Sequence, residues 1–182
     1  MTPLVRTIEP VDLVQLATEE ALQVAIVVSR YNEWITCNLR EGAVAAFERR
    51  LGGTESTVTI IEAPGAFELP LLVSEAIQSG AFHAVVALGC VIKGETSHDQ
   101  HINHSVSSTL AHIAADHGVP VGFGLLTVES AKQAEARAGG AMGNKGAEAM
   151  DAALDTLAML EALALVEGDQ ANDEDDDDEE LE

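Results

Sequence analysis

Short apolar runs alternate with longer stretches of mixed polarity through most of this chain of 182 residues. Four of the apolar runs have the length and composition of buried strands, at 24–28, 58–61, 84–90 and 121–126. The stretches between and after them predict helices at 35–51, from about 69 to 79, at 97–117, at 130–138 and at 145–166. Because strands alternate with helices, the pattern predicts an α/β domain in which a four-stranded parallel sheet is flanked by helices on both faces.

The two ends of the chain lack this alternation. Apolar residues recur only weakly over 1–22, so we expect an arm there, or a short edge strand that could add to the sheet of a neighbouring subunit. Nine of the ten residues in 173–182 are acidic, a composition that cannot bury enough apolar area to offset chain entropy. We therefore expect an arm over 1–22, one domain over 23–168 and a disordered acidic tail over 169–182. The tail is expected to raise solubility, and the alternative is that it binds a cationic partner.

Composition and charge narrow the classes of function. Hydrophobic residues make up 47% of the chain, yet no apolar run approaches the length of a membrane span, and the first residues lack the pattern of a signal peptide. The formal charge of −22 argues against nucleic acid or an anionic membrane as a partner. Ten of the 31 acidic residues follow Gly168, so 21 acidic and nine basic residues leave 1–168 with a charge of −12. The two cysteines, Cys37 and Cys90, fit reduced thiols in a cytoplasmic protein better than a disulfide framework.

The stretch 89–98, GCVIKGETSH, is where the third predicted strand ends and a helix begins. Ser97 and Gln100 have the spacing of a capping box, and Gly94 just before them lets the backbone approach a ligand closely. Unpaired N–H groups at a helix start favour phosphate or carboxylate. The same helix dipole disfavours a protonated His98 in the first turn, which suits a general base. The stretch predicts an anion site beside a proton carrier, and the alternative is an ordinary connection with a surface histidine.

Ligands of open parallel sheets bind beyond the carboxyl ends of the strands. This rule brings to one edge four segments that lie far apart in the sequence: 31–32, 66–68, 94–98 and Phe123. Cations are few in the domain, and three of them lie beside glycine-rich turns, where they could hold an anion: Lys93, Arg137 and Lys145.

Six sequence blocks within about 22–160 occur together in the order and spacing of a known enzyme family. They are RYN at 30–32, APGAFELP at 63–70, LGCVIKGETSH at 88–98, FGLLT at 123–127, QA and RAG within 133–139, and GNKG and EA within 143–149. In these blocks the chain resembles the lumazine synthase family. The resemblance implies a flavodoxin-like three-layer fold, no metal or redox cofactor, and assembly into pentamers, some of which form sixty-subunit shells.

The resemblance also implies a reaction of riboflavin biosynthesis, the condensation of 5-amino-6-(D-ribitylamino)uracil with 3,4-dihydroxy-2-butanone 4-phosphate through an imine, with loss of phosphate and ring closure. On the pyrimidine side, Tyr31 would stack on the ring, with Asn32 beside it. The ribityl pocket would be lined by Ala66, Phe67 and Glu68, of which the glutamate would accept hydroxyl hydrogen bonds. Backbone groups of Val91 and Ile92 would meet the uracil edge.

On the phosphate side, the resemblance implies a cradle of backbone N–H groups, aided by the guanidinium of Arg137. The cradle would consist of Gly94, Glu95 and Thr96. His98 would move protons during imine formation and elimination. Phe123 and Lys145 would complete the site from an adjacent subunit.

Three positions depart from the usual pattern of the family. Tyr31 stands where phenylalanine is usual and keeps a stacking face. Lys93 stands where arginine is common, so a bidentate contact is lost there. Asp99 follows His98 where an aromatic residue is common, and this departure bears on the packing around the histidine.

Other interpretations of the same residues remain open. A catalytically silent cage or scaffold protein could keep the fold, and a flavodoxin-type module could bind flavin mononucleotide as a monomer. The histidines at 98, 101 and 104 recur along one helix, but no thiolate or carboxylate cluster accompanies them, so we expect no metal site. Phe67 and Phe123 could be core aromatics, and Glu68 could serve only to cap a helix.

Overall fold

Four parallel strands form the centre of the computed structural model, which describes residues 7–176. The sheet order is β2-β1-β3-β4, with β1 at Gln23–Ser29, β2 at Thr57–Ala63, β3 at Ala84–Ile92 and β4 at Val121–Val128. β1 and β3 are the inner strands, and Val24 of β1 lies opposite both Val58 of β2 and Ala84 of β3. Nearly all residues of the inner strands are buried. The predicted four-stranded parallel sheet is confirmed.

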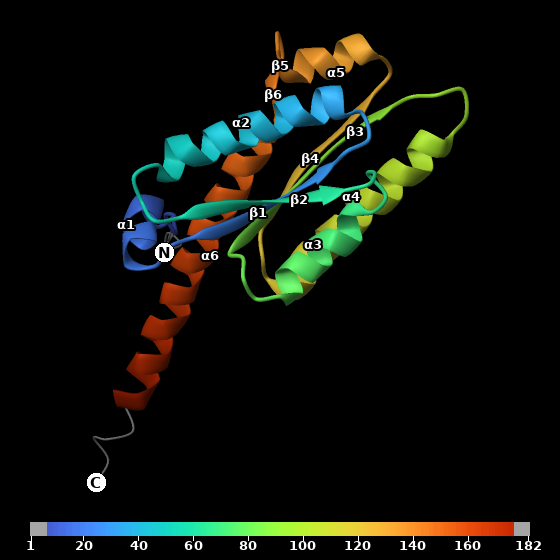
Figure 1. Ribbon diagram of the computed structural model, residues 1–182. Helices are drawn as coiled ribbons and strands as arrows, with labels where there is room; N and C mark the ends of the chain where they lie inside the picture. Colours follow the sequence, from blue (N-terminus) through green and yellow to red (C-terminus); the bar gives the residue numbers. More distant parts are fainter. Residues whose placement is uncertain (1–6, 177–182) are drawn as a thin grey trace, which may run out of the picture.

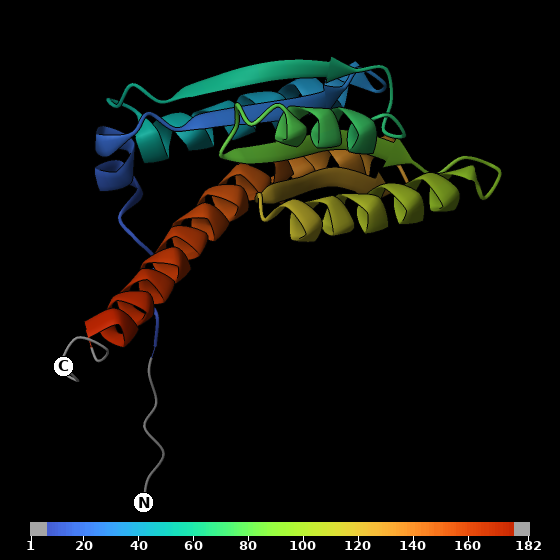
Figure 2. The ribbon, with the colours of Figure 1, turned by 90° about the horizontal axis from the view of Figure 1, so that it is seen from below.

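Helices cover both faces of the sheet and complete three layers (Figures 1 and 2). α2 and α6 lie on one face and α3 and α4 on the other, with bounds Glu33–Leu51, Lys145–Asp176, Leu69–Gln78 and His98–His117 in that order. Successive residues of β1 point into different layers: Ile26 packs in the core with α2 and α6, whereas Val27 packs in the core with α3 and α4. Both layers are apolar, which explains why the inner strands read as continuous apolar runs rather than alternating ones.

Several elements extend beyond their predicted bounds. β3 continues to Ile92 and β4 to Val128, because these two residues pair in the same parallel ladder. The extension carries β3 to the sheet edge where ligands were expected, and the backbone N–H of Lys93 adds one more bond to the carbonyl of Val128 at 2.8 Å.

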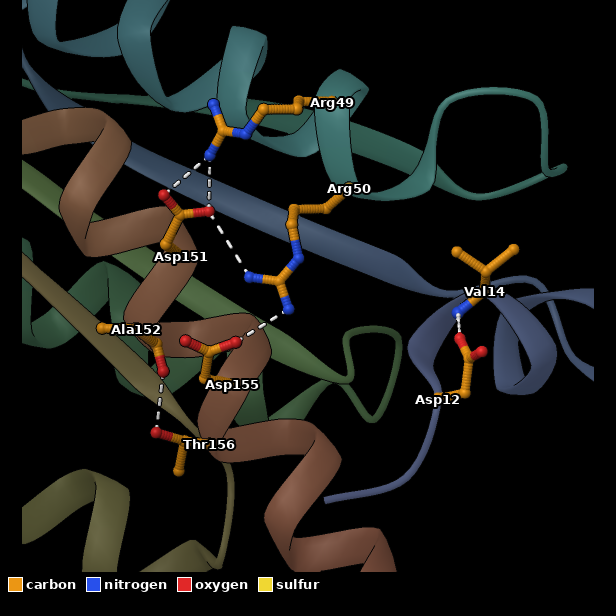
Figure 3. A network of polar contacts seen from close by, with 8 residues as sticks. All are labelled: Asp12, Val14, Arg49, Arg50, Asp151, Ala152, Asp155 and Thr156. Carbon is orange, nitrogen blue, oxygen red and sulfur yellow. Dashed lines mark hydrogen bonds and ion pairs between the residues drawn. The ribbon is translucent and has the colours of Figure 1, made fainter. Parts of the chain in front are cut away.

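A short helix, α1 (Leu13–Glu19), lies where the sequence led us to expect an arm or an edge strand. The carboxylate of Asp12 caps it by accepting a hydrogen bond from the backbone N–H of Val14 at 2.9 Å (Figure 3). Leu13 and Ala17 are buried in the core with α2 and α6. A helix of seven residues is too short for its periodicity to stand out in the sequence. Residues 1–6 of the expected arm lie outside the described residues, and the addition of an N-terminal edge strand to a neighbouring subunit stays a prediction.

The last helix, α6, continues to Asp176 and so passes the predicted boundary at 168. Once a helix is formed, each further residue adds one backbone hydrogen bond, so a helix can extend past its last packed turn. Residues 177–182 lie outside the described residues, and the disorder expected for the tail stays a prediction. Within 7–176, none of the helices is both long enough and apolar enough to cross a membrane.

A small antiparallel hairpin between α5 (Ala131–Arg137) and α6 was not predicted from the sequence. Its strands are β5 (Ala138–Gly140) and β6 (Gly143–Asn144). Gly139 and Gly143 have φ values of +101° and +75°, which side chains other than glycine rarely adopt. The glycine-rich segment therefore forms a defined turn that leads α5 into the start of α6.

Charged residues connect the two helices on the α2/α6 face (Figure 3). Arg49 donates two hydrogen bonds to the carboxylate of Asp151, at 2.7 and 2.8 Å, and Arg50 pairs with Asp155 at 2.7 Å. Arg50 also approaches Asp151 at 3.5 Å. These side chains are partly exposed, so we expect each pair to contribute about 1 kcal/mol or less to the free energy of unfolding.

Candidate active site

A cavity of about 460 Å³ opens at the carboxyl ends of β1 and β3. Nine of the predicted site residues line it: Tyr31, Ala66, Phe67, Glu68, Val91, Ile92, Gly94, Thr96 and His98. The predicted residues Asn32 and Glu95 are adjacent in sequence to lining residues but are not among those that line the cavity. The structure therefore brings together residues from three separate connections, as the strand-end rule predicted.

The connection from β1 to α2 holds Tyr31 at the mouth of the cavity. Asn32 has a left-handed backbone (φ 59°), and its side-chain amide donates a hydrogen bond to the carbonyl of Cys90 at 3.0 Å. This bond ties the end of β1 to the end of β3, so Asn32 shapes the cavity from behind the lining residues. The hydroxyl of Thr36 donates to the carbonyl of Ser29 at 2.7 Å and holds the other side of the connection. The phenol ring of Tyr31 is 70% exposed, as a ring that stacks on a ligand needs to be.

The connection from β2 to α3 contributes an aromatic ring and a carboxylate. Phe67 is 62% exposed, so the alternative that it is a core aromatic is wrong. Glu68 occupies the N-cap position of α3, but its side chain makes no capping hydrogen bond, which leaves the carboxylate facing the cavity. A Cβ at Gly65 would come within 2.9 Å of that carboxylate, so the glycine provides room for it.

The connection from β3 to α4 differs from the predicted capping box. The side chain of Ser97 makes no capping bond, and the backbone N–H groups of Gln100 and His101 donate instead to the Ser97 carbonyl, at 3.1 and 3.4 Å. Ser97 has φ −81° and ψ 12°, close to a helical turn, whereas a side-chain cap needs an extended backbone. The predicted box is therefore wrong.

The backbone N–H groups of residues 94–97 find no hydrogen-bond acceptor within the described part of the chain. A Cβ at Gly94 would meet no atom within 4 Å, so the space before it is open. Donors at the start of a 20-residue helix, with open space before them, suit an anion such as phosphate. His98, the first residue of α4, is exposed and lines the same cavity.

The other three predicted residues, Phe123, Arg137 and Lys145, line a separate depression of about 270 Å³ beside β4. Phe123 is 50% exposed, so the core alternative is wrong for this ring as well. Arg137 donates to the carbonyl of Gln133 at 3.2 Å, and Lys145 pairs with Glu148. Within one chain, the two cations are therefore grouped with Phe123 and not with the free amides of 94–97.

Asn144 fixes the start of α6 directly before Lys145, which lines this depression, and the sequence pattern had suggested no role for it. Its side-chain oxygen Oδ1 accepts hydrogen bonds from the backbone N–H groups of Gly146 and Ala147, at 2.8 and 3.3 Å, and so caps α6. Its amide donates to the carbonyl of Asn38 on α2 at 2.8 Å. An asparagine directly before an expected helix start is a recognisable capping signal, and it could have been noticed.

Four residues that line the main cavity were also missed as site residues, and one of them is Gly65, described above. Ile102 lies one turn after His98 on the same helix face, a spacing visible in the sequence. Asp99 also lines the cavity. Cys90 lies in the wall, where burial raises the pKa of its thiol to about 11 and so keeps it protonated at neutral pH. This disfavours a nucleophilic role for Cys90. Among the side chains that the structure describes, those of residues 7–166, no three of His, Cys, Asp or Glu are grouped so that they could hold a metal ion.

The similarity of this chain to known proteins extends over both parts of the site, the main cavity and the depression beside β4. The family model for 6,7-dimethyl-8-ribityllumazine synthase matches residues 21–161, which extend from before β1 into α6. A protein of Nitratidesulfovibrio vulgaris (strain DSM 19637 / Miyazaki F) described as 6,7-dimethyl-8-ribityllumazine synthase is 44% identical over 144 residues, or 79% of this chain and 92% of the relative. Neither similarity favours a silent scaffold. The chain therefore belongs to the 6,7-dimethyl-8-ribityllumazine synthase family, which consists of transferases of riboflavin biosynthesis.

Proposed function

We propose that this chain condenses 5-amino-6-(D-ribitylamino)uracil with 3,4-dihydroxy-2-butanone 4-phosphate at a site that two copies of the chain form together. The observation that carries the proposal is the set of unpaired N–H groups of 94–97, which lie beside His98 at one end of the cavity. Loss of phosphate needs the leaving dianion stabilised in place, and imine formation needs a nearby group that transfers protons. This end of the cavity provides both.

The pyrimidine binds in the remainder of the cavity. The exposed rings of Tyr31 and Phe67 offer faces for stacking, and the uncapped carboxylate of Glu68 can accept hydrogen bonds from ribityl hydroxyls. Val91 and Ile92, at the end of β3, offer backbone groups to the uracil edge. Ala66 lines this pyrimidine part of the cavity, and Asn32 holds its wall in place through the hydrogen bond to the carbonyl of Cys90.

The reaction then proceeds in three steps. The amino group attacks the ketone and loses water to give an imine, His98 accepts and returns protons, and phosphate leaves from the cradle formed by Gly94, Glu95 and Thr96. In ring closure the ribitylamino nitrogen adds to the carbonyl carbon that remains after phosphate is lost, and a second water leaves to give the product. No metal or redox cofactor is needed, because every step is a proton transfer, an addition or an elimination.

A neighbouring copy supplies the second part of the site. The cavity itself is lined by no lysine or arginine of the described residues, whereas Arg137 and Lys145 lie in the depression beside β4. A phosphate dianion held by amides alone gains from a guanidinium close by. Exposed apolar side chains in both parts, Phe67 in the cavity and Phe123 in the depression, suit a contact between copies.

The proposed assembly is a pentamer, alone or within a sixty-subunit shell, and light scattering distinguishes the two. We also propose a cytoplasmic location, supported by the free state of Cys37 and Cys90.

Mixing two impaired variants tests the shared site, provided that turnover is measured at a concentration of the phosphorylated substrate far below the KM of Arg137→Ala. His98→Ala damages the first part of every site and Arg137→Ala damages the second. If the parts come from different copies, co-expression restores turnover at about a quarter of the sites, since random pairing leaves that share with both parts intact. Turnover is measured by the absorbance of the product. If the co-assembled variants at this substrate concentration turn over no faster than the separate variants, the shared site is refuted.

A further inference from the structure

The helix that follows Glu68 does not use the carboxylate of this residue. Glu68 occupies the N-cap position of α3, but its side chain makes no capping hydrogen bond. An N-cap side chain usually accepts from the backbone N–H of the second or third helical residue, and the second residue here is Pro70, which has no N–H. Glu68 also has a helical backbone (φ −84°, ψ −9°), whereas a side-chain cap needs an extended one.

The same carboxylate is unpaired and open to the cavity. None of the ion pairs within the described part of the chain involves Glu68. The residue is half-buried and lines the main cavity, so a ligand there can reach it. An ionised carboxylate only accepts hydrogen bonds, so hydroxyl groups are suitable partners for it.

Gly65 lies directly beside this carboxylate. A Cβ at Gly65 would lie 2.9 Å from Oε2 of Glu68, closer than the 3.4–4 Å of ordinary contact. Apart from the two adjacent residues, that Cβ would meet no other atom within 4 Å. The φ of Gly65 is not in the left-handed region, so the backbone conformation does not require glycine. A methyl group at this position would therefore displace only the carboxylate, which ends a flexible side chain.

We propose that Gly65 is a positioning residue: the absence of a Cβ sets where the Glu68 carboxylate lies, and this gives the cavity its preference for a hydroxylated chain on the pyrimidine. The inference rests on the proposed function, in which Glu68 accepts hydrogen bonds from the ribityl hydroxyls. Gly65 has no side chain to offer to a ligand, so it acts through Glu68. A methyl group at this position moves the carboxylate away from the hydroxyls, and hydrogen bonds weaken steeply as their geometry is lost.

Binding of two pyrimidines to the intact protein tests this inference without turnover. Calorimetry compares 5-amino-6-(D-ribitylamino)uracil with 5-amino-6-(pentylamino)uracil, which has a chain of the same length without hydroxyls. We expect Gly65→Ala and Glu68→Ala each to weaken binding of the ribityl compound about tenfold, the lower end of the range for a hydrogen bond to a charged group. Binding of the pentyl compound should change less than threefold in both variants.

The double variant Gly65→Ala/Glu68→Ala distinguishes positioning from direct obstruction, because Gly65 itself lines the cavity. If Gly65 acts through Glu68, adding Gly65→Ala to Glu68→Ala should change binding of the ribityl compound less than twofold. A tenfold loss that persists without the carboxylate means that the methyl group blocks the ligand itself, and it overturns the inference. Equal weakening of both compounds by Gly65→Ala, or weakening of neither, overturns it as well.

Glu75→Ala is the matched control for Glu68→Ala, because Glu75 is an exposed glutamate on the same helix that does not line the cavity. It should bind both compounds as the unmodified protein does. Urea denaturation checks Gly65→Ala, and a loss of folding would assign the glycine a structural role and overturn the inference. If the unmodified protein binds neither compound, or binds both equally, the proposed function of the cavity fails and this inference fails with it. If the unmodified protein prefers the ribityl compound and Gly65→Ala keeps that preference, only this inference fails.

Discussion

The cavity at the ends of β1 and β3 and the depression beside β4 hold different kinds of chemistry. The cavity contains exposed aromatic rings, the carboxylates of Glu68 and Asp99, unpaired backbone amides and His98, and no cationic side chain of the described residues lines it. The depression contains one exposed ring together with the cations Arg137 and Lys145. Proton transfer and anion neutralisation are therefore separated within one chain, and a reaction that expels phosphate needs both. Under the proposed function, this separation makes a single chain incomplete as a catalyst.

The two regions also differ in how they are held in place. The cavity depends on turns at three strand ends, tied by the bond from Asn32 to the carbonyl of Cys90. The depression depends on Asn144, which both caps α6 and bonds to α2. A substitution in the cavity should therefore affect proton transfer or binding of the pyrimidine, and a substitution in the depression should affect binding of the phosphorylated substrate.

The largest expected effect is on the proton-transfer side. We expect His98→Ala to lower kcat by about 10² to 10⁴, the usual contribution of a general acid or base, while the KM values of both substrates change little. Steady-state kinetics with each substrate varied in turn measures this. His101→Ala, an exposed histidine that does not line the cavity, is the control. A loss of less than tenfold would reduce His98 to an accessory role.

A smaller effect is expected on the cationic side. Arg137→Ala should raise the KM of the phosphorylated substrate about ten- to hundredfold, because a hydrogen bond between charged groups is lost, and should leave the KM of the pyrimidine almost unchanged. Lys132→Ala on the same helix α5 is the control. Equal increases in the two KM values would contradict the division of roles between the two regions.

Asn144→Ala sharpens the comparison through stability as well as kinetics. Loss of the cap and of the bond to α2 should lower the free energy of unfolding by about 1–2 kcal/mol, measured by urea denaturation. The KM of the phosphorylated substrate should rise, since Lys145 and the hairpin before it lose their support. Binding of the pyrimidine should remain at its original strength, and if it weakens in parallel, the two regions are not independent.

The smallest effect is expected away from both regions. Asp151→Ala removes the carboxylate that joins Arg49 and Arg50 to α6 (Figure 3). We expect a loss of about 1 kcal/mol or less in the free energy of unfolding, which diminishes further in 1 M salt, and unchanged kinetics. Altered KM values in this variant would show that the ion pairs between α2 and α6 influence substrate binding.

Part of the site could be predicted because it depends on patterns among residues that are close together in the sequence. Apolar runs and breakers located the strand ends, and residues at the ends of parallel strands must lie along one edge, so Tyr31, Phe67 and His98 were predicted to be close together. The capping of α4 was predicted incorrectly, because the motif at Ser97 fits two backbone geometries and only the φ and ψ values distinguish them.

The sequence by itself determined the layered α/β fold and the edge of the sheet at which the cavity opens, because burial and the period of apolar residues are properties of neighbours along the chain. Only the tertiary structure decided which side chains share a surface. It separated Arg137 from the amides of 94–97, turned Asn32 toward Cys90 and left an oxygen of Asp99 buried without a partner. Those placements depend on how helices pack across β3 and β4, and contacts between residues distant in sequence leave no local pattern to read.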